Sequence, residues 1–502
     1  MLEWVEEQIR ACPEWENILL NKSPKDKATT IIGLNGGQKA AVLAALWRQA
    51  KEHLLVITFS PRQAEVLLRD LEVWVGKANL LYFPAYELLP HEEAYEREIA
   101  GVRLRTAERV LAEERKLVIT SWAALERKML PPELLVSRVI EITLGQAVER
   151  NFLLNALVML GYERVELVEN PGEFSVRGDI VDLFAPACDL PVRIEFFGDE
   201  VDSIREFDPQ TQCSCEQISR YTIYPAREGI WTEEEFRRAE PAIRESLAHQ
   251  VSALKGQESE GEALQLKARM EELLHRLASN TPFPGSDRFI PLIHQELASF
   301  LDYLPTAHVI LDEPVRGEEY YRQRALENAK TLSSSLDRGL ILPQEQAGLF
   351  TAEELIPLVY QQAIIHLSVL THSVKRSRAN ITLPLRPVEG FAGKSREFLD
   401  VLRRHHKERV VVGLLVYGQE RREHLRRSLA EAEIPAVLGP VGGAPAPGTV
   451  YIMEGTLESG FIYPQGKLAI YTEAEIFGQA RRPKRVRFSS EGVKLTAFSD
   501  LK

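Results

Sequence analysis

The sequence predicts an α/β protein in which a small α+β domain with an antiparallel sheet interrupts a parallel-sheet domain, and a second small α/β domain follows. Three observations support this prediction. Short apolar segments alternate with helix-like segments over residues 1–128. Strand-like runs separated by turn residues occupy Gly172–Asp208, and strand and helix patterns alternate again over about 365–480. A chain of 502 residues is long enough for about three or four domains.

The first domain begins with a repeated strand–helix–strand pattern. Thr29–Gly33 and Leu54–Phe59 are short apolar runs typical of buried strands, and the amphipathic stretch Lys39–Ala50 lies between them. Two further runs, Asn79–Pro84 and Lys116–Ser121, are separated by a charged helical stretch. This rhythm predicts a parallel sheet with helices on its faces.

The pattern changes at Pro131-Pro132, where the small domain begins. A helix is expected at Ala147–Leu160, and the runs that follow are separated by turn residues, as antiparallel strands are. A charged helical stretch covers Thr232–Asn280, and a buried strand returns at His308–Asp312. We therefore expect the small domain to be inserted into the α/β domain.

The last domain is predicted from three strands, Arg409–Leu415, Thr449–Met453 and Lys467–Thr472, with a Pro/Gly-rich loop at Gly439–Gly448. The predicted division of the chain is a discontinuous α/β domain at 1–128 and 224–360, an inserted domain at 129–223, a third domain at 361–480 and a basic linker at 481–502.

The acidic composition of the chain indicates which class of molecule it binds. The formal net charge is −12, whereas a protein that grips nucleic acid usually has a basic surplus because phosphate contacts dominate its affinity. We therefore expect a protein partner. No apolar run approaches the ~20 residues of a membrane span, and the acidic N-terminus is unlike a signal peptide, so a cytoplasmic protein is expected.

The four cysteines predict neither a disulfide framework nor a metal site. Cys213 and Cys215 form a CxC pair without a second pair at ligand spacing, and Cys12 and Cys188 are isolated. We expect reduced thiols, no metal and no cofactor.

The segment Val192–Phe197 has the alternation of a half-buried strand. Its period places Val192, Ile194 and Phe196 on one face, and Arg193, Glu195 and Phe197 on the other. An arginine beside a large aromatic side chain is typical of a protein interface. The alternative is that Phe197 packs under a neighbouring helix and Arg193 pairs with Glu195.

Arg177 belongs to a less regular strand. Its face is mixed, since it alternates with Ser175, Asp179 and Val181, and Gly178 is expected to mark a bulge that re-aims the arginine.

The sequence of this region resembles that of a known domain. RGDIVDLF followed by RIEFFGDEVDSI resembles the small domain shared by the excision-repair protein UvrB and the transcription-repair coupling factor (Mfd) family. In both families this domain docks on UvrA. The resemblance implies that Arg177, Arg193 and Phe197 contact UvrA. Arginine suits this task because its planar fork can give a carboxylate two hydrogen bonds.

The strand-to-helix turn at Gly33–Ala40 has the position of a phosphate-binding loop in a RecA-like domain but lacks two of its residues. A working loop reads GxxxxGK[ST]. Here Gln38 replaces the second glycine and Ala40 replaces the hydroxyl residue that holds magnesium. Lys39 remains and is expected to be a surface lysine at a helix start.

Asp312 and Glu313 end an apolar run as Walker B carboxylates do, although an ordinary strand with acidic residues after it fits equally well. ATP hydrolysis is therefore not expected at this degenerate loop, which comprises Gly33, Gly36, Gln38, Lys39, Ala40, Asp312 and Glu313.

Two further features favour the coupling-factor side of the resemblance. UvrB carries a Tyr-rich hairpin, whereas Phe83–Glu98 and its surroundings offer only Tyr82, Tyr86 and Tyr95. TVYIMEGTLESGFIYPQGKLAIYTEAEIFG resembles the third domain of the coupling factors, which UvrB lacks. The chain stops where their RNA-polymerase-binding domain would begin, and the run Arg481–Arg487 is expected to be a linker.

The functional hypothesis is a UvrB-mimicking adaptor: the non-motor N-terminal part of a coupling factor that binds UvrA and brings excision repair to stalled RNA polymerase. In the family, RNA polymerase, double-stranded DNA, ATP and magnesium belong to domains absent here. A monomer without enzyme activity is expected.

Two alternatives stay open. One is a UvrB-like ATPase subunit of the excision nuclease, and the other is a clamp that restrains the missing motor, whose distal domain is thought to cover the UvrA-binding face in the family. A direct DNA-binding role is disfavoured by the acidic balance.

Overall fold

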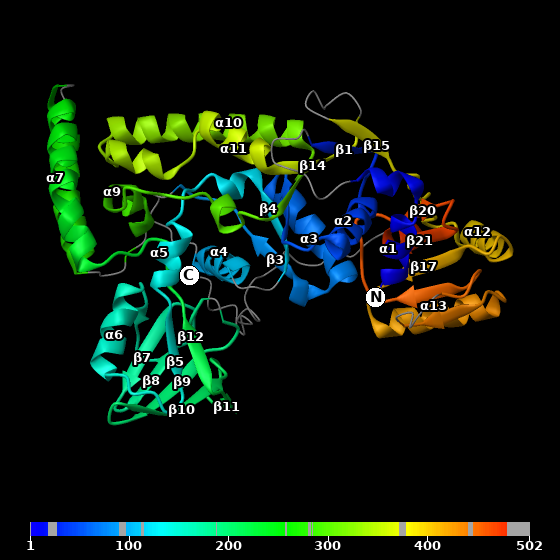
Figure 1. Ribbon diagram of the computed structural model, residues 1–502, viewed down its shortest axis with the longest axis horizontal. Helices are drawn as coiled ribbons and strands as arrows, with labels where there is room; N and C mark the ends of the chain where they lie inside the picture. The colour runs from blue at the N-terminus through cyan, green and yellow to red at the C-terminus, as the bar shows by residue number, and fades with distance from the viewer. Residues whose placement is uncertain are drawn as a thin grey trace, which may run out of the picture.

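The structure is a computed structural model of the 502-residue chain. It describes residues 2–18, 28–89, 97–111, 115–186, 188–256, 259–279, 283, 285–370, 378–439 and 445–478. The molecule is elongated, with a central sheet between the small inserted sheet and the sheet of the C-terminal part (Figure 1). The mixed α/β fold class predicted from the sequence is confirmed.

The central sheet has seven strands in the order β15-β1-β14-β13-β2-β4-β3, and all neighbouring strands pair in parallel. Strands that come before and after the insertion interleave, so the sheet is discontinuous in sequence. The strands are β1 (Thr29–Ile32), β2 (Leu54–Thr58), β3 (Leu80–Phe83), β4 (Leu117–Ser121), β13 (His308–Asp312), β14 (Ala363–Ser368) and β15 (Ala379–Thr382).

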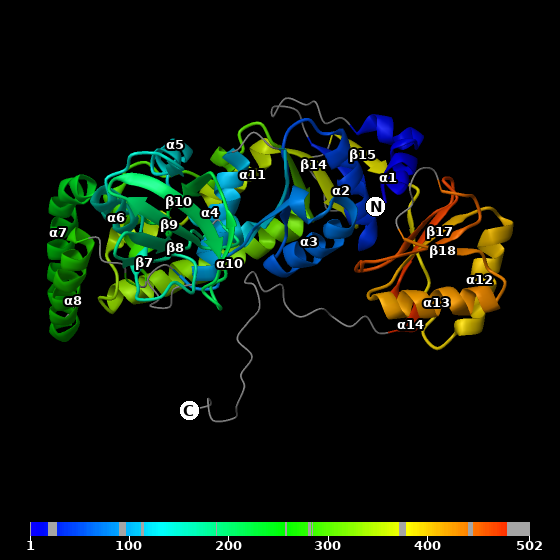
Figure 2. The same cartoon turned by 90° about the horizontal axis from the view of Figure 1, so that it is seen from below.

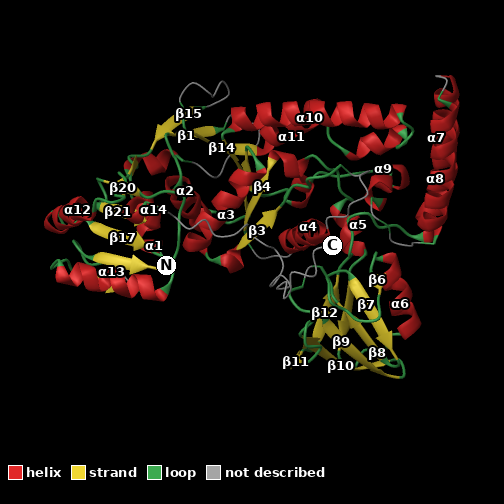
Figure 3. Ribbon diagram, turned by 180° about the vertical axis from the view of Figure 1, so that it is seen from behind, coloured by secondary structure: helices red, strands yellow, loops and turns green. Residues whose placement is uncertain are grey.

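Helices cover both faces of the central sheet, as short buried strands of a parallel sheet require. One face packs on α2 (Gly37–Gln49) and α3 (Pro61–Val75). The other packs on α4 (Arg97–Leu111), α10 (Pro314–Asp337) and α11 (Ala352–Gln362) (Figure 3). The predicted strands agree with β1 to β4 and β13 to within two residues at each end.

The central sheet extends past residue 360, where the sequence analysis ended the first domain, because β14 pairs between β1 and β13 and β15 pairs outside β1. Which sheet a buried apolar run joins is decided by distant partners, and nothing in the run AIIHLS itself specifies them.

The insert contains the predicted antiparallel meander. Its six-stranded sheet has the order β11-β10-β9-β8-β7-β6, and α6 (Arg150–Met159) packs on one face (Figure 1). A two-stranded sheet of β5 (Ile140–Thr143) and β12 (Arg220–Ile223) closes the same core. The six strands are β6 (Glu163–Arg164), β7 (Glu173–Arg177), β8 (Ile180–Leu183), β9 (Val192–Phe197), β10 (Glu200–Phe207) and β11 (Ser214–Gln217).

Helices connect the insert to the central sheet. The chain enters the insert through α5 (Pro132–Ser137) and leaves it through the antiparallel pair α7 (Glu233–Gly256) and α8 (Glu260–Ala278), then α9 (Ile290–Ile293), before it returns to β13. Short 3₁₀ turns lie at Pro13–Asn17, Lys77–Asn79, Trp122–Leu125, Ser286–Phe289, Phe300–Tyr303 and Pro343–Gly348.

The C-terminal sheet has the order β16-β20-β21-β17-β19-β18. On one face it packs against α12 and α13, and on the other it shares a core with α1 (Glu3–Arg10), α2 and α3 of the first part (Figure 2). Its elements are β16 (Arg386–Pro387), α12 (Ser395–Lys407), β17 (Val411–Leu415), α13 (Gln419–Glu431), β18 (Ala436–Leu438), β19 (Val450–Met453), β20 (Phe461–Tyr463), β21 (Leu468–Thr472) and α14 (Glu473–Phe477).

Within the described ranges, no helix is both long and apolar enough to cross a membrane. The basic run Arg481–Arg487 and part of the loop at Gly439–Gly448 lie outside the described residues.

Candidate partner-binding surface and nucleotide loop

Strand β9 separates an apolar face from a face with charged and aromatic side chains. Val192, Ile194 and Phe196 are buried in the core of the insert, together with residues of α6. Phe197, the last residue of the strand, is 82% exposed. The predicted alternation is therefore present, and Phe197 does not pack under a described helix. A large aromatic side chain this exposed is suited to fill a pocket of another protein.

Two arginines on this outer face share one buried carboxylate. Asp182 of β8 is fully buried. Arg193 grips it with two hydrogen bonds, from Nε to Oδ1 at 2.8 Å and from Nη2 to Oδ2 at 2.9 Å. Arg177 donates a third hydrogen bond from Nη2 to Oδ2 at 2.6 Å. The hydrogen bonds that Arg193 donates to Asp182 raise the pKa of the Arg193 guanidinium, which is therefore held in its charged form.

Strand register produces this arrangement. Asp182 is directly opposite Arg193 in β9 and opposite Ser175 in β7, and Arg177 reaches it diagonally from two residues further along β7. The Arg193 guanidinium also lies over the ring of Phe207, 4.9 Å from its centroid. Arg193 is thus held by Asp182 and by the ring of Phe207, and its side chain is only 18% exposed, against 50% for Arg177.

Two sequence-based expectations are not met: a pair between Arg193 and Glu195, and a bulge at Gly178. Arg193 pairs with Asp182 rather than with Glu195, whose carboxylate accepts a hydrogen bond from Ser203 Oγ at 2.8 Å. Gly178 is not a bulge: Arg177 pairs with Ile180, so Gly178 forms the tight turn between β7 and β8, and its φ of +62° suits glycine.

Sequence reasoning missed two residues of this surface. One is Asp182, and the other is Arg205 of β10, which is exposed and lies directly opposite Arg193. The side chain of Arg205 makes no hydrogen bond or ion pair with any residue that the structure describes. Side-by-side arginines on neighbouring strands are unfavourable unless an anion separates them. Arg205 therefore adds an exposed positive charge to this face next to Arg193, whereas the residue opposite Phe197 is Glu200.

The lysine of the nucleotide loop is buried, so the prediction of a surface lysine is wrong. Lys39 Nζ lies 2.6 Å from Oδ1 of Asp312 and 3.5 Å from Oε1 of Glu313. The start of α2 is covered at Gly36 and Gly37 by the connection between β19 and β20, and Lys39 is only 5% exposed. Burial raises the pKa of Asp312, and the neighbouring Lys39 opposes that rise. The three predicted residues are therefore brought together as an internal ion cluster.

The backbone N–H groups that would cradle phosphate already have partners inside the protein. One of the acceptors is the side chain of Gln38, the residue that replaces the second glycine. Another is the carbonyl oxygen of Ser459, in the connection between β19 and β20. The hydrogen bonds run from Asn35 N–H to Gln38 Oε1 (3.1 Å), Gly36 N–H to Asn35 Oδ1 (3.0 Å), Gly37 N–H to Ser459 O (3.2 Å), Gln38 N–H to Asn35 O (3.1 Å) and Lys39 N–H to Gly36 O (3.0 Å).

The loop's other predicted members have structural roles. Gly33 follows β1 with φ +85°, its N–H donates to Ser368 O at 2.9 Å, and Ala40 is fully buried in α2. Of the tyrosines noted in the sequence, Tyr82 and Tyr86 are buried, so neither is available to stack on a base, and Tyr95 lies outside the described residues.

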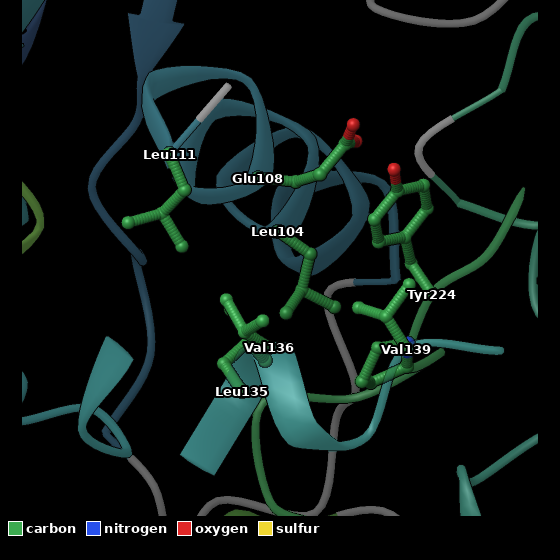
Figure 4. Close-up of a pocket in the computed structure, with 8 residues that line it drawn as sticks. Leu104, Glu108, Leu111, Leu135, Val136, Val139 and Tyr224 are labelled. Carbon is green, nitrogen blue, oxygen red and sulfur yellow. The ribbon is translucent and has the colours of Figure 1, made fainter. Parts of the chain in front are cut away.

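A cavity of about 210 Å³ lies where the insert meets the central sheet (Figure 4). Glu108 of α4 and Tyr224, which follows β12, point toward one another at its rim (Figure 4). Burial raises the pKa of both groups. The rest of the lining is apolar and comes from Leu104, Leu111, Leu135, Val136, Val139 and Pro225. The cavity marks the joint between the two parts, and Glu108 and Tyr224 are its polar lining residues.

Among the described residues, no cluster of three or more His, Cys, Asp or Glu side chains has the arrangement of a metal site. Cys213 and Cys215 are exposed and unbridged.

Comparison with known proteins places these sites in context. Residues 140–228 match the UvrB interaction domain. The chain is 30% identical over 500 residues to the transcription-repair-coupling factor of Bacillus subtilis (strain 168), which covers 98% of this chain and 42% of the relative. The factor of Staphylococcus aureus (strain Mu50) is 26% identical over 479 residues, covering 94% of this chain and 40% of the relative.

The factor of Staphylococcus epidermidis (strain ATCC 12228) gives the same identity over 481 residues. The chain thus spans about two fifths of the length of the curated relatives it matches. Over nearly its whole length, the chain is related to the N-terminal part of the transcription-repair-coupling factors, and it carries a UvrB interaction domain.

Proposed function

We propose that this chain is an adaptor that binds UvrA through the outer face of the β7–β10 sheet. The observation that carries the proposal is the placement of Phe197, 82% exposed, on the same face as an arginine pair organised by Asp182. The matched UvrB interaction domain includes every residue of this surface. An apolar anchor beside fixed cations suits a partner that offers an apolar pocket flanked by carboxylates.

The three residues predicted to contact UvrA would contribute differently. Phe197 and Arg177 are exposed enough to contact a partner directly. In Arg193, by contrast, the Nε and Nη2 groups of the guanidinium both donate hydrogen bonds to Asp182. Arg193 would therefore act partly by holding Asp182, and through it Arg177, in place.

In a complete coupling factor, this surface would bring UvrA to RNA polymerase stalled at DNA damage. RNA polymerase and double-stranded DNA would then be partners of other domains, and ATP and magnesium would belong to the motor. We further propose that the chain itself is a cytoplasmic monomer that uses no cofactor.

The alternative of a UvrB-like ATPase is disfavoured by the nucleotide loop. Its lysine is engaged by Asp312 and Glu313, and the loop's backbone donors from Asn35 to Lys39 are satisfied internally. Saturable binding in a titration with ATP and magnesium would support the ATPase hypothesis instead.

The direct test is calorimetric titration of the chain with UvrA, first with the wild type and then with Arg193→Ala/Phe197→Ala and with Phe197→Ala. Phe152→Ala is a matched control, because Phe152 is also exposed (62%) but lies on α6, on the opposite side of the sheet. We expect both variants that lack Phe197 to lose binding and the control to keep it. No binding by the wild type would refute the adaptor.

A further inference from the structure

The connection between β19 and β20 lies directly on the nucleotide loop. Ser459, near the end of this connection, accepts the Gly37 N–H hydrogen bond at 3.2 Å with its carbonyl oxygen. Gly37 is the first residue of α2. In a working loop, this stretch of backbone donates to phosphate oxygens. Here a carbonyl oxygen of the same chain is the acceptor.

The fit between the two segments depends on glycine. A Cβ at Gly37 would lie 2.3 Å from Ser459 O, and a Cβ at Gly36 would lie 1.9 Å from Ser459 Oγ. Real Cβ contacts are not this short. At Gly37 the neighbour is a backbone oxygen, so a side chain there is not accepted while the connection is docked; at Gly36 the neighbour is a side-chain oxygen, and the φ of +47° adds a second reason for glycine. Ser459 occupies the space beside the two glycines, where a phosphate-binding loop would hold a phosphate.

Contacts on α3 extend the docking site beyond one hydrogen bond. The Glu458 N–H donates to Oδ1 of Asp70 at 2.9 Å, and Asp70 is 4% exposed. Leu457 is 3% exposed in the core that α2 and α3 share with the C-terminal sheet. The ring of Phe461, at the start of β20, stacks on Trp74 with centroids 6.3 Å apart.

The electrostatics of the loop agree with a neutral occupant. Lys39, the cation that would face a phosphate, is paired with Asp312 and Glu313. The positive end of α2 therefore faces the polar but uncharged carbonyl of Ser459, which needs no counter-ion.

We propose that the degenerate nucleotide loop is an interdomain docking site whose ligand is the 454–460 connection of the C-terminal sheet. The Ser459 carbonyl occupies the position of a phosphate oxygen, and the contact fixes the C-terminal sheet to the central sheet. This gives the C-terminal sheet a role that does not depend on UvrA binding. The loop's glycines are needed for this contact instead of for ATP.

Hydrogen exchange of the full chain, resolved by peptide, tests the proposal from the side of the loop. Gly37→Ala places a methyl group against Ser459 O, although alanine at the first turn of a helix is otherwise favourable. We expect amide exchange in 454–461 to accelerate by about tenfold or more, while β4 and β13 stay protected. Gly261→Ala is the control, because Gly261 lies in α8 with open space around its Cβ position.

A second variant tests the same contact from the other side. Leu457→Ala leaves the loop sequence intact but weakens docking, so the Gly37 amide should lose its acceptor and exchange faster, again by about tenfold or more. Unchanged exchange of 454–461 in Gly37→Ala, or of the loop in Leu457→Ala, would overturn the proposal. If Gly37→Ala fails to fold, Leu457→Ala decides alone.

Discussion

Arg193 and Asp182 form a bidentate ion pair across neighbouring strands, with both hydrogen bonds shorter than 3.0 Å and the carboxylate fully buried. Because Arg177 donates to the same carboxylate, one anion fixes two cations on the outer face of the insert. The pair converts a flexible arginine into a rigid part of the sheet, and rigid side chains lose less entropy when a partner binds.

The Asp182 pair predicts a stability effect that is separate from UvrA. Asp182→Asn should lower the unfolding free energy of the insert by about 2 kcal/mol, since two arginines lose a charged acceptor but regain part of their hydration from solvent. Thermal melting of the wild type and the variant measures this. Asp199→Asn, at the exposed turn between β9 and β10, is the control. Equal melting of the wild type and Asp182→Asn would mean that the carboxylate does not organise this surface.

Phe197→Ala should change binding without changing stability. Its side chain is mostly in water, so truncation removes little buried area from the fold. Loss of an interface anchor typically costs about 2 kcal/mol or more, which weakens the affinity for UvrA by about 30-fold. Titration calorimetry and melting curves of the same preparation separate the two effects. A variant that melts lower than the Phe152→Ala control would indicate a structural role for Phe197.

The sequence predicted burial along β9 but not the partners of its arginine. Alternation is a local property, so Val192–Phe197 can be divided into two faces by inspection. Register is not local: Asp182 lies 11 residues before Arg193, and nothing within either strand specifies that they face each other. Asp182 inside the apolar run IVDLF was the available signal, because a charge within such a run needs a partner.

The non-local nature of tertiary contacts also explains why Lys39 was wrongly predicted to lie at the surface. Lys39 and Asp312 are 273 residues apart, so the sequence near the lysine does not show the carboxylate with which it is buried. The sequence could show that Gln38 and Ala40 spoil a phosphate loop. It could not show what fills the loop, since Ser459 comes from a connection between two strands of a different sheet.

Lys39→Met should destabilise the chain by about 3 kcal/mol, because it leaves Asp312 and Glu313 buried without their cation. Adding Asp312→Asn should recover part of the loss, since a neutral amide needs no counter-ion. Denaturant unfolding of the single and double variants tests this coupling. Lys51→Met, at an exposed position, controls for the change of residue type. Additive effects of the two substitutions would show that Lys39 and Asp312 do not interact.

Asp70 predicts how stability depends on pH. Burial raises the pKa of Asp70 from 3.8 to about 8, against the lowering effect of the Glu458 N–H that it accepts. A carboxyl group with a higher pKa in the fold than in the unfolded chain favours folding at low pH. That contribution is lost as the pH rises from about 4 to about 8.

Asp70→Asn removes this titration. The variant should therefore gain stability relative to the wild type as the pH rises, by several kcal/mol at pH 8.5 and much less at pH 5. Melting temperatures of both proteins across this range measure the difference, and Asp202→Asn, at an exposed position, is the control. Parallel melting curves for the wild type and Asp70→Asn would mean that Asp70 is already ionised in the fold. The Glu458 N–H favours the ionised form of Asp70, so the destabilisation at high pH comes from the burial of the charged carboxylate and not from a weaker hydrogen bond between α3 and the 454–460 connection.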